Sequence, residues 1–341
     1  MFRSAALVCC NGIFAEFANF YAPGRKPTRK TRHLFGTHVA NGTSRVLFNA
    51  RDMTQTRKMR LLVGYNGTPF AKAAIEELSR AGLPPNVDAL VLTVAELCCP
   101  TVQSGDAEQV AAEGAGFLRS RFPEWYVVTQ TVTGVPIREM IAAEQSFKAD
   151  LVVLGEPGVR ADGKPTSFLG PVSQGVLTGG KSSLRITRTH ATLEETPPNL
   201  LVGFDGSDGA DKAVAAIASR SWPIGTSVRL LSIDDTGVLG TIRNLSPQLR
   251  AAAVGAGFAS RWAETLASKA LKQLTEAGLD ASVEVRSGHP QNALIEGASD
   301  SNADCIFVGP NKCESSLDHF LLGSVSASVA AHANCTVEIV R

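Results

Sequence analysis

Two short stretches, LLVGYNGT at residues 61–68 and LLVGFDGS at residues 200–207, are near copies of each other and decide the fold. Each is an apolar run of strand length that closes on Asn-Gly or Asp-Gly, which is typical of a strand that ends in a tight turn. Because so specific a stretch recurs, we expect the chain to contain two copies of one folding unit.

Further matches keep the same order and nearly the same spacing. The segment ADLVVLG at 149–155 returns as ADCIFVG at 303–309, with an offset of 154 residues. The segment FLGPVS at 168–173 returns as LLGSVS at 321–326, with an offset of 153 residues. The duplication therefore covers whole domains rather than a single motif.

Apolar runs and helical patterns alternate along the second copy. The expected strands are 199–204, 228–233, 281–286, 305–308 and 336–340, and the expected helices are 209–220, 247–277, one that begins at Pro290, and 323–333. Such alternation gives right-handed crossovers and a parallel sheet covered on both faces. We predict two tandem doubly wound α/β domains, at residues 59–188 and 199–341, joined by a linker at 189–198 that contains two prolines.

Composition excludes several classes of protein. Hydrophobic residues make up 44% and charged residues 19% of the chain, which suits two packed cores and not a disordered protein. A net charge of +1 argues against a nucleic-acid partner, and no apolar run approaches the roughly 20 residues that span a bilayer. Seven cysteines without a CxxC pair fit neither a disulfide framework nor a zinc site. We expect a cytoplasmic protein without a metal site.

Residues 1–58 differ in composition from the rest of the chain, because they hold ten Lys and Arg against two acidic residues and show no sustained periodicity. We expect a basic, disordered extension there. A cleavable transit peptide is one alternative, and a start assigned too early, with Met53 or Met59 as the true beginning, is another.

Glycines and small hydroxyl residues recur where the first and fourth strands of each copy end. In an open doubly wound sheet the strand order reverses at these ends, and a crevice for ligands opens there. Glycine lets the backbone approach a ligand, and amides at the start of the next helix can hold a phosphate. Asp205 follows strand one, where its carboxylate could accept hydrogen bonds from sugar hydroxyls. This arrangement suits a nucleotide.

These motifs resemble the universal stress protein family over about 270 of the 341 residues. The resemblance rests on DGS at 205–207, Gly309 and LGSVS at 322–326, and on their partners NGT at 66–68, GEPG at 155–158 and GPVS at 170–173. It implies, in each half, a five-stranded parallel sheet in the order 3-2-1-4-5 with helices on both faces. One subgroup of the family binds ATP through the pattern G-x2-G-x9-G-(S/T) after strand four.

The resemblance implies two candidate sites for ATP, with or without Mg²⁺. In the second copy the candidate binding residues are Phe204, Asp205, Ile233, Val308, Gly309, Lys312, Gly323, Ser324, Val325 and Ser326. In the first copy they are Asn66, Val94, Gly155, Gly158, Gly170 and Ser173. Asp205 would hold the ribose, Ile233 and Val308 would line the adenine pocket, and Gly309, Gly323, Ser324 and Ser326 would accept the phosphates.

Neither copy keeps the whole ATP pattern. In the first copy Asn66 replaces the aspartate, and Pro171 replaces the hydroxyl residue and removes an amide donor. In the second copy Lys312 stands where the second glycine of the pattern belongs, but Asp205 and the Gly-Ser pair remain. The second copy is therefore favoured for nucleotide binding. The alternative is a purely structural role, in which the glycines preserve tight turns and Asp205 forms an Asx-type turn.

The functional hypothesis is a nucleotide-responsive regulatory module of the stress response, without a robust catalytic role. Weak ATP hydrolysis lacks an identifiable base in the sequence. The competing hypothesis is an interaction scaffold that has lost nucleotide binding, as Asn66, Pro171 and Lys312 suggest. Protein partners cannot be named from the sequence.

Residues 175–182, GVLTGGKS, match the P-loop expression G-x4-G-K-[ST] in full. A P-loop follows a strand and opens a helix, whereas this segment follows the fourth expected helix and precedes a strand. We therefore reject a P-loop here. We expect Gly179 or Gly180 to end that helix in a left-handed conformation, and Lys181 to offset its negative end.

Each copy ends in an apolar, alternating strand, at 183–187 and 336–340, which would expose unpaired backbone groups at a sheet edge. Members of the resembled family commonly dimerise through strand five. We therefore predict an intramolecular pseudo-dimer in which these two last strands pair, with further homo-oligomerisation left open. Arg188 of the first copy matches the terminal Arg341 of the second.

Overall fold

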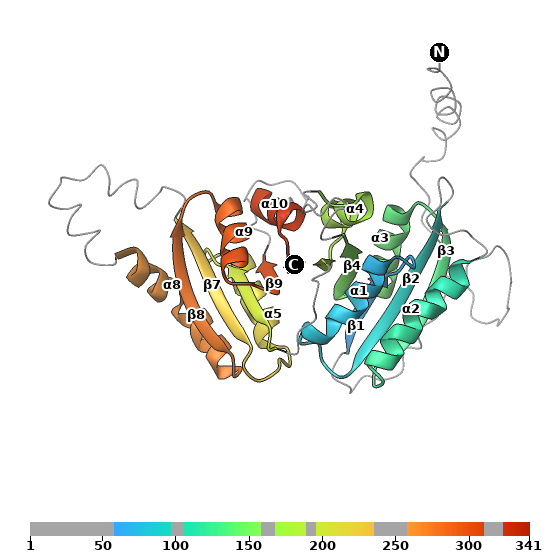
Figure 1. Cartoon of the computed structure of the whole chain (residues 1–341), viewed down its shortest axis with the longest axis horizontal. Coiled ribbons are helices and arrows are strands. Elements are labelled where there is room, and N and C mark those ends of the chain that lie inside the picture. Colours follow the sequence, from blue (N-terminus) through green and yellow to red (C-terminus); the bar gives the residue numbers. More distant parts are fainter. Residues whose placement is uncertain (1–57, 97–105, 158–167, 189–195, 235–257, 310–322) are drawn as a thin grey trace, which may run out of the picture. The chain divides into compact units, whose positions relative to one another are not determined.

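The computed structural model describes residues 58–96, 106–157, 168–188, 196–234, 258–309 and 323–341 (Figure 1). The expected N-terminal extension up to residue 57 and linker residues 189–195 lie outside this described part. Among the described residues, no helix is both long enough and apolar enough to cross a bilayer.

The first half alternates strands and helices along the chain. Its elements are β1 (Met59–Gly64), α1 (Pro69–Glu77), a short 3₁₀ turn (Leu78–Arg80), β2 (Val87–Glu96), α2 (Ala107–Arg121), β3 (Tyr126–Gly134), α3 (Pro136–Phe147), β4 (Leu151–Glu156), α4 (Pro171–Gly179) and β5 (Ser183–Arg188).

The second half repeats this order. Its elements are β6 (Asn199–Gly203), α5 (Asp208–Ala218), β7 (Ser227–Asp234), α8 (Phe258–Glu276), β8 (Asp280–Ser287), α9 (Pro290–Asp300), β9 (Cys305–Val308), α10 (Ser324–His332) and β10 (Thr336–Ile339). The expected helix 247–277 is thus described from Phe258 onward, and residues 247–257 lie outside the described part.

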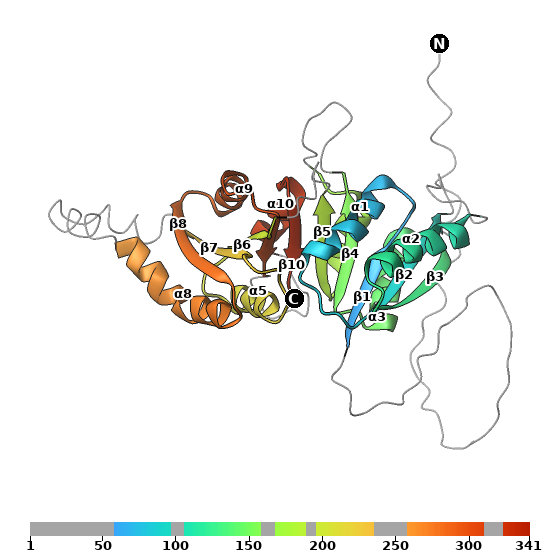
Figure 2. The same ribbon diagram turned by 60° about the horizontal axis from the view of Figure 1, so that its bottom comes forward.

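The strand order confirms the predicted doubly wound topology in both halves. Parallel pairing gives the order β3-β2-β1-β4-β5 in the first half and β8-β7-β6-β9-β10 in the second, which is 3-2-1-4-5 twice. The last strands, β5 and β10, are antiparallel neighbours, so the described strands form one ten-stranded sheet. Figure 2 shows β5 and β10 next to each other where the two halves meet.

Matching local signals start the first helix of each half. Thr68 caps α1 by accepting a hydrogen bond from the Ala71 amide at 3.3 Å, and Ser207 caps α5 by accepting one from the Ala210 amide at 3.2 Å. The glycine just before each cap has a φ of +74°, a left-handed conformation that favours glycine. The left-handed glycine and the cap that follows it explain why the first strands end in Asn-Gly-Thr and Asp-Gly-Ser.

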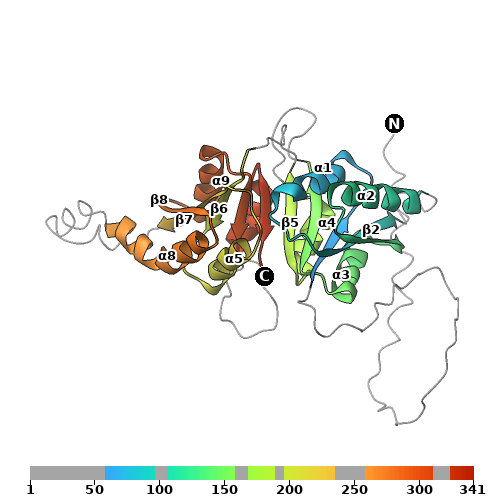
Figure 3. The ribbon, with the colours of Figure 1, turned by 90° about the horizontal axis from the view of Figure 1, so that it is seen from below.

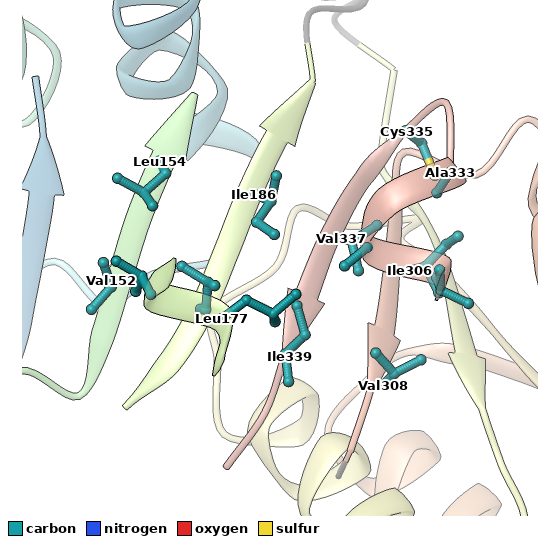
Figure 4. Packing of buried hydrophobic residues seen from close by; sticks show 14 of the residues in the cluster. Val152, Leu154, Leu177, Ile186, Ile306, Val308, Ala333, Cys335, Val337 and Ile339 are labelled. Atoms are coloured by element: carbon teal, nitrogen blue, oxygen red, sulfur yellow. The ribbon is translucent and has the colours of Figure 1, made fainter. Parts of the chain in front are cut away.

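The two faces of the sheet are packed differently. On one face, α3, α4, α9 and α10 cover a single apolar cluster that runs from one half to the other across β5 and β10 (Figure 4). On the opposite face, α1 and α2 cover one cluster and α5 and α8 cover another, each within its own half. Figure 3, turned to view the ribbon from below, labels α1 and α2 in the first half and α5 and α8 in the second.

Candidate functional site

A cavity of about 370 Å³ lies in the second half, where β6, β7 and β9 end and α5, α9 and α10 begin. This is the reversal point of the strand order, and its volume falls within the range of about 300 to 1,000 Å³ typical of ligand sites. Nine of the residues proposed from the sequence line it: Phe204, Asp205, Ile233, Val308, Gly309, Gly323, Ser324, Val325 and Ser326. Lys312 lies outside the described residues.

Asp205 lies at the end of β6, in a turn that its own carboxylate helps to form. Its Oδ1 atom accepts a hydrogen bond from the Ser207 amide at 3.0 Å, which makes an Asx-type turn. The residue is solvent-exposed and also lines the cavity. The structural role foreseen for Asp205 is thus present, and it is compatible with a second role toward a ligand because a carboxylate has several acceptor positions.

The start of α10 forms the opposite wall of the cavity. Gly323 is the N-cap and supplies no capping side chain, so in the described residues no side chain caps this helix end. Ser324 is exposed, while Ser326 is buried and its Oγ donates to the Gly309 carbonyl at 3.2 Å. Backbone amides at a helix start carry partial positive charge, so this wall favours an anion.

The first half has a cavity of about 310 Å³ at the equivalent place. Five of its six proposed residues line it, namely Asn66, Val94, Gly155, Gly170 and Ser173, and Gly158 lies outside the described residues. Asn66 forms the same kind of turn as Asp205, because its Oδ1 accepts from the Thr68 amide at 3.3 Å and from the Thr68 hydroxyl at 2.7 Å. The two loops are thus alike in geometry and differ in charge.

Glu156 distinguishes the first cavity, and sequence reasoning missed it. Its carboxylate accepts a hydrogen bond from the Gly170 amide, at 3.2 Å to each oxygen, and the residue is only 7% exposed. Glu156 therefore puts a protein carboxylate at the start of α4, where an anionic ligand would need donors. The signal lay inside the quoted GEPG segment, because the second copy has proline at the equivalent position 310.

Two further side chains set the first cavity apart. Glu96, at the end of β2, adds a second carboxylate to its lining. Tyr65 lines the cavity where the second half has Phe204. Burial, together with the nearby carboxylate of Glu113 that shares a hydrogen bond with the phenol, raises the pKa of Tyr65 to about 12. Two glutamate side chains and a phenol thus line the first cavity, whereas the second has neither at these positions.

The glycines at the ends of β4 and β9 have a packing role. A Cβ atom on Gly155 would lie 2.1 Å from the Phe70 carbonyl oxygen, and one on Gly309 would lie 2.0 Å from the Gly209 carbonyl oxygen. No side chain fits at either position without moving the backbone of the first helix. The recurrence of these glycines therefore does not by itself indicate a ligand.

The P-loop-like segment holds a carboxylate of the protein itself. It lies at the end of α4 and the start of β5, as expected, and the amides of Lys181 and Ser182 both donate to Glu144 Oε1 at 2.5 Å. The expected left-handed glycine is wrong, because Gly180 has an extended backbone with φ of −76°. A left-handed residue is not needed here, since the chain extends directly toward β5 and Glu144 takes the next two amides.

Comparisons with known proteins agree on the fold. The model of the "Universal stress protein family" matches residues 198–341. A universal stress protein from Archaeoglobus fulgidus DSM 4304 is 20% identical with a TM-score of 0.55, and the alignment covers 83% of this chain and 96% of that chain. A functionally unknown protein from Pseudomonas aeruginosa PAO1 is 14% identical with a TM-score of 0.52, over 83% of this chain and 92% of that chain.

A universal stress protein family protein from Arabidopsis thaliana, solved with AMP bound, is 16% identical with a TM-score of 0.29, over 42% of this chain and 91% of that chain. A search of curated proteins returned no match. The family model covers the second half, and the structural likeness of the first two proteins extends over most of the chain. Residues 198–341 therefore match the model of the universal stress protein family, and the half that precedes them has the same doubly wound fold.

Proposed function

We propose that the second half binds an adenine nucleotide, ATP with Mg²⁺, and that the protein acts as a nucleotide-responsive regulatory module in the stress response rather than as an enzyme. The observation that carries this proposal is the cavity at the reversal point of the second sheet. It brings to one place a carboxylate at the end of β6 and the start of α10, which no side chain of the described residues caps.

Each wall of this cavity suits one part of the nucleotide. The carboxylate of Asp205 would accept hydrogen bonds from the ribose hydroxyls, while the apolar side chains of Ile233 and Val308 would contact the adenine. The backbone at Gly309 and Gly323, with the amides and hydroxyls of Ser324 and Ser326, would hold the phosphates at the start of α10.

We infer that the first half does not bind nucleotide. The carboxylate of Glu156 already accepts from the Gly170 amide, and Glu96 adds a second negative charge to the same cavity. Pro171 also removes an amide donor from the first turn of α4. These observations favour the scaffold hypothesis for this half alone, in which it supports the second half and contacts protein partners.

We also infer that the halves form an intramolecular pseudo-dimer in solution. The antiparallel pairing of β5 with β10 and the apolar cluster shared across them support this inference. Pairing of the last strands leaves neither as an unpaired edge.

The experiment that tests nucleotide binding is isothermal titration of the full chain with Mg-ATP, comparing the wild type with Ser324→Asp. The new carboxylate at the start of α10 imitates Glu156 of the first half. Unit charges about 4 Å apart interact by roughly 1 to 4 kcal/mol near a protein surface, so we expect affinity to fall at least about fivefold. The unfolding temperature should not fall, because an acidic residue suits a helix start.

The matched control is Ser268→Asp on α8, another exposed serine, which does not line the cavity. It adds the same charge and should leave Mg-ATP affinity unchanged. No heat with the wild type at millimolar Mg-ATP would refute nucleotide binding. Equal losses in the two variants would refute the position of the phosphates.

A further inference from the structure

The pairing of β5 with β10 brings one pair of repeat-equivalent residues face to face. The registered pairs are Leu184 with Ile339, Arg185 with Glu338 and Ile186 with Val337. With the offset of 153 that relates the last strands, position 185 is equivalent to position 338. Arg185 thus faces its own counterpart, which places this pair on the local two-fold axis between the halves.

The two counterparts carry opposite charges in a buried setting. Arg185 Nη1 lies 2.8 Å from Glu338 Oε2, and the two side chains are 1% and 0% exposed. Each is also bound within its own half. Arg185 donates through Nε and Nη2 to Glu77 at the end of α1, at 2.9 and 2.5 Å, and Glu338 accepts from Arg220, which follows α5.

The contacts within each half leave a donor on one side of the axis and an acceptor on the other. Glu77 uses the Nε and Nη2 side of Arg185, so Nη1 is the nitrogen directed at the partner strand. Two first halves paired in this way would bring two Nη1 donors together, and two second halves would bring two carboxylates together. The first arrangement leaves the buried Nη1 groups without an acceptor on the partner strand, and both arrangements set like charges opposite each other.

The other strand pairs and the terminal arginines do not distinguish partners in this way, although a partly exposed ion pair, Arg80 with Asp304 at 2.8 Å, also crosses between the halves away from the axis. The other two registered pairs are apolar and lie in the shared cluster. The terminal arginines are the same residue in both copies. Arg188 donates to the carbonyls of Ala330 and Ala331 near the end of α10, and Arg341 donates to those of Leu177, Gly180 and Ser182 near the end of α4. A pair of like halves could make these reciprocal contacts equally well.

We propose that the Arg185–Glu338 pair makes this interface selective, so that a first half accepts a second half as its strand partner and like halves are rejected. The partner that fits the β5 edge is thus a strand with an acidic residue at the axis, which this chain supplies itself. This inference rests on the proposed pseudo-dimer, and it adds the residue that decides which halves pair.

The test uses the full chain with a protease site placed between residues 189 and 195. The folded protein is cut there, unfolded in urea and refolded so that the halves can exchange, and native mass spectrometry counts the pairs. We expect the wild type to return pairs of one first and one second half. In Glu77→Gln/Arg185→Met/Arg220→Gln/Glu338→Met, which neutralises the axis and leaves no orphan charge at position 77 or 220, like pairs should rise at least about tenfold.

The matched control is Arg188→Met/Arg341→Met, which removes two arginines that are equivalent in the repeat. It should weaken all pairs alike and leave the share of like pairs at the wild-type value. Abundant like pairs in the wild type, or no rise in the neutral variant, would overturn the proposed selectivity. If the cut wild type separates into single halves, the pseudo-dimer itself is refuted, whatever the Mg-ATP titration shows.

Discussion

The two cavities occupy the same place in two copies of one fold, yet they present opposite chemistry to an anion. Both lie where the strand order reverses, and both have an Asx-type turn after the first strand. In the first half the Gly170 amide is bound to Glu156, whereas in the second half α10 follows Gly323 and no side chain in the described part of the chain caps it. The comparison teaches that a few charged side chains can change what a doubly wound domain binds while its backbone stays the same.

The contact between the halves shows the same divergence. Apolar positions of β5 and β10 have remained apolar, but the equivalent positions 185 and 338 have become arginine and glutamate. The residues that shape the backbone are therefore shared by both copies, while the charged residues at positions 185 and 338 differ between them. Each prediction below changes one charge to break or sharpen this difference.

The largest effect is expected from Arg185→Glu, which makes the first half carry the charge of the second. The new carboxylate would face Glu338 and lie beside Glu77, all in buried positions. Breaking a buried ion pair costs about 3 to 5 kcal/mol, so the free energy of unfolding should fall by at least about 3 kcal/mol in a urea titration.

The control for this change is Arg229→Glu, which reverses one partner of a half-exposed pair. Arg229 lies 3.1 Å from Glu284, and the two side chains are 41% and 31% exposed. An ion pair of this exposure contributes about 0 to 1 kcal/mol, so the loss should be small. Similar losses in both variants would show that the position on the axis has no special energetic role.

The next largest effect is expected from Asp205→Asn, which gives the second cavity the turn residue of the first. Asparagine keeps an oxygen for the Ser207 amide, as Asn66 does for Thr68, but removes the charge offered to a ribose. A hydrogen bond to a charged group is worth about 1 kcal/mol more than a neutral one, so Mg-ATP affinity should fall about fivefold. The change Asn66→Ala should leave that affinity unaltered, and an equal loss from it would place binding in the first half instead.

An effect of similar size, on stability rather than on affinity, is expected from Glu156→Gln, which removes the charge that occupies the start of α4. A negative group at a helix start contributes about 0.3 to 1 kcal/mol, and up to about 2 kcal/mol when partly buried, so stability should fall by about 1 kcal/mol. Glu108, in the first turn of α2, is exposed, and Glu108→Gln should cost no more than a few tenths. If thermal unfolding shows equal costs, Glu156 is not a specific partner of α4.

Much of this fold could be predicted from the sequence because its signals are local. Glycine at the ends of strands, proline in the first turn of α9 and the alternation of apolar runs are each visible within a few residues. The expected helix 323–333 is α10, Ser324–His332, and the expected strand 336–340 is β10, Thr336–Ile339. The duplication then fixed the order of elements in both halves, which the strand pairing confirms.

The cavity linings followed from a topological rule, whereas the charges that distinguish them did not. Glu156 is separated from Gly170 by 14 residues, and only the folded chain brings the carboxylate to that amide. Arg185 and Glu338 are separated by 153 residues, and each fits the ordinary alternation of polar and apolar residues along a strand. Long-range polar contacts of this kind leave no periodic pattern, which is why sequence reasoning missed them.

The smallest effect is expected from a decrease in pH, which protonates Glu338 on one side of the axis and leaves Arg185 on the other side charged. Burial alone would raise the pKa of Glu338, but the guanidinium groups of Arg220 and Arg185 outweigh burial and lower it below its usual value. The stabilising contribution of Glu338 is therefore complete above the unfolded pKa of about 4.3 and is lost as pH falls toward the folded pKa. Its counterpart Arg185 stays charged throughout this range, so acid removes the carboxylate of the axis pair and leaves the guanidinium.

Glu338→Gln provides the comparison, because glutamine keeps the size of the side chain and does not titrate. Between pH 5 and pH 4 the stability advantage of the wild type over Glu338→Gln should shrink by about 0.5 kcal/mol, since the unfolded wild type takes up a proton that the folded protein resists. Urea titrations at closely spaced pH values can resolve this difference, because the other carboxylates titrate alike in both proteins. Parallel stability curves from pH 5 to pH 4 would mean that Glu338 is not held as a carboxylate by the two arginines, and the opposite charges on the axis would then not explain how the halves are held together.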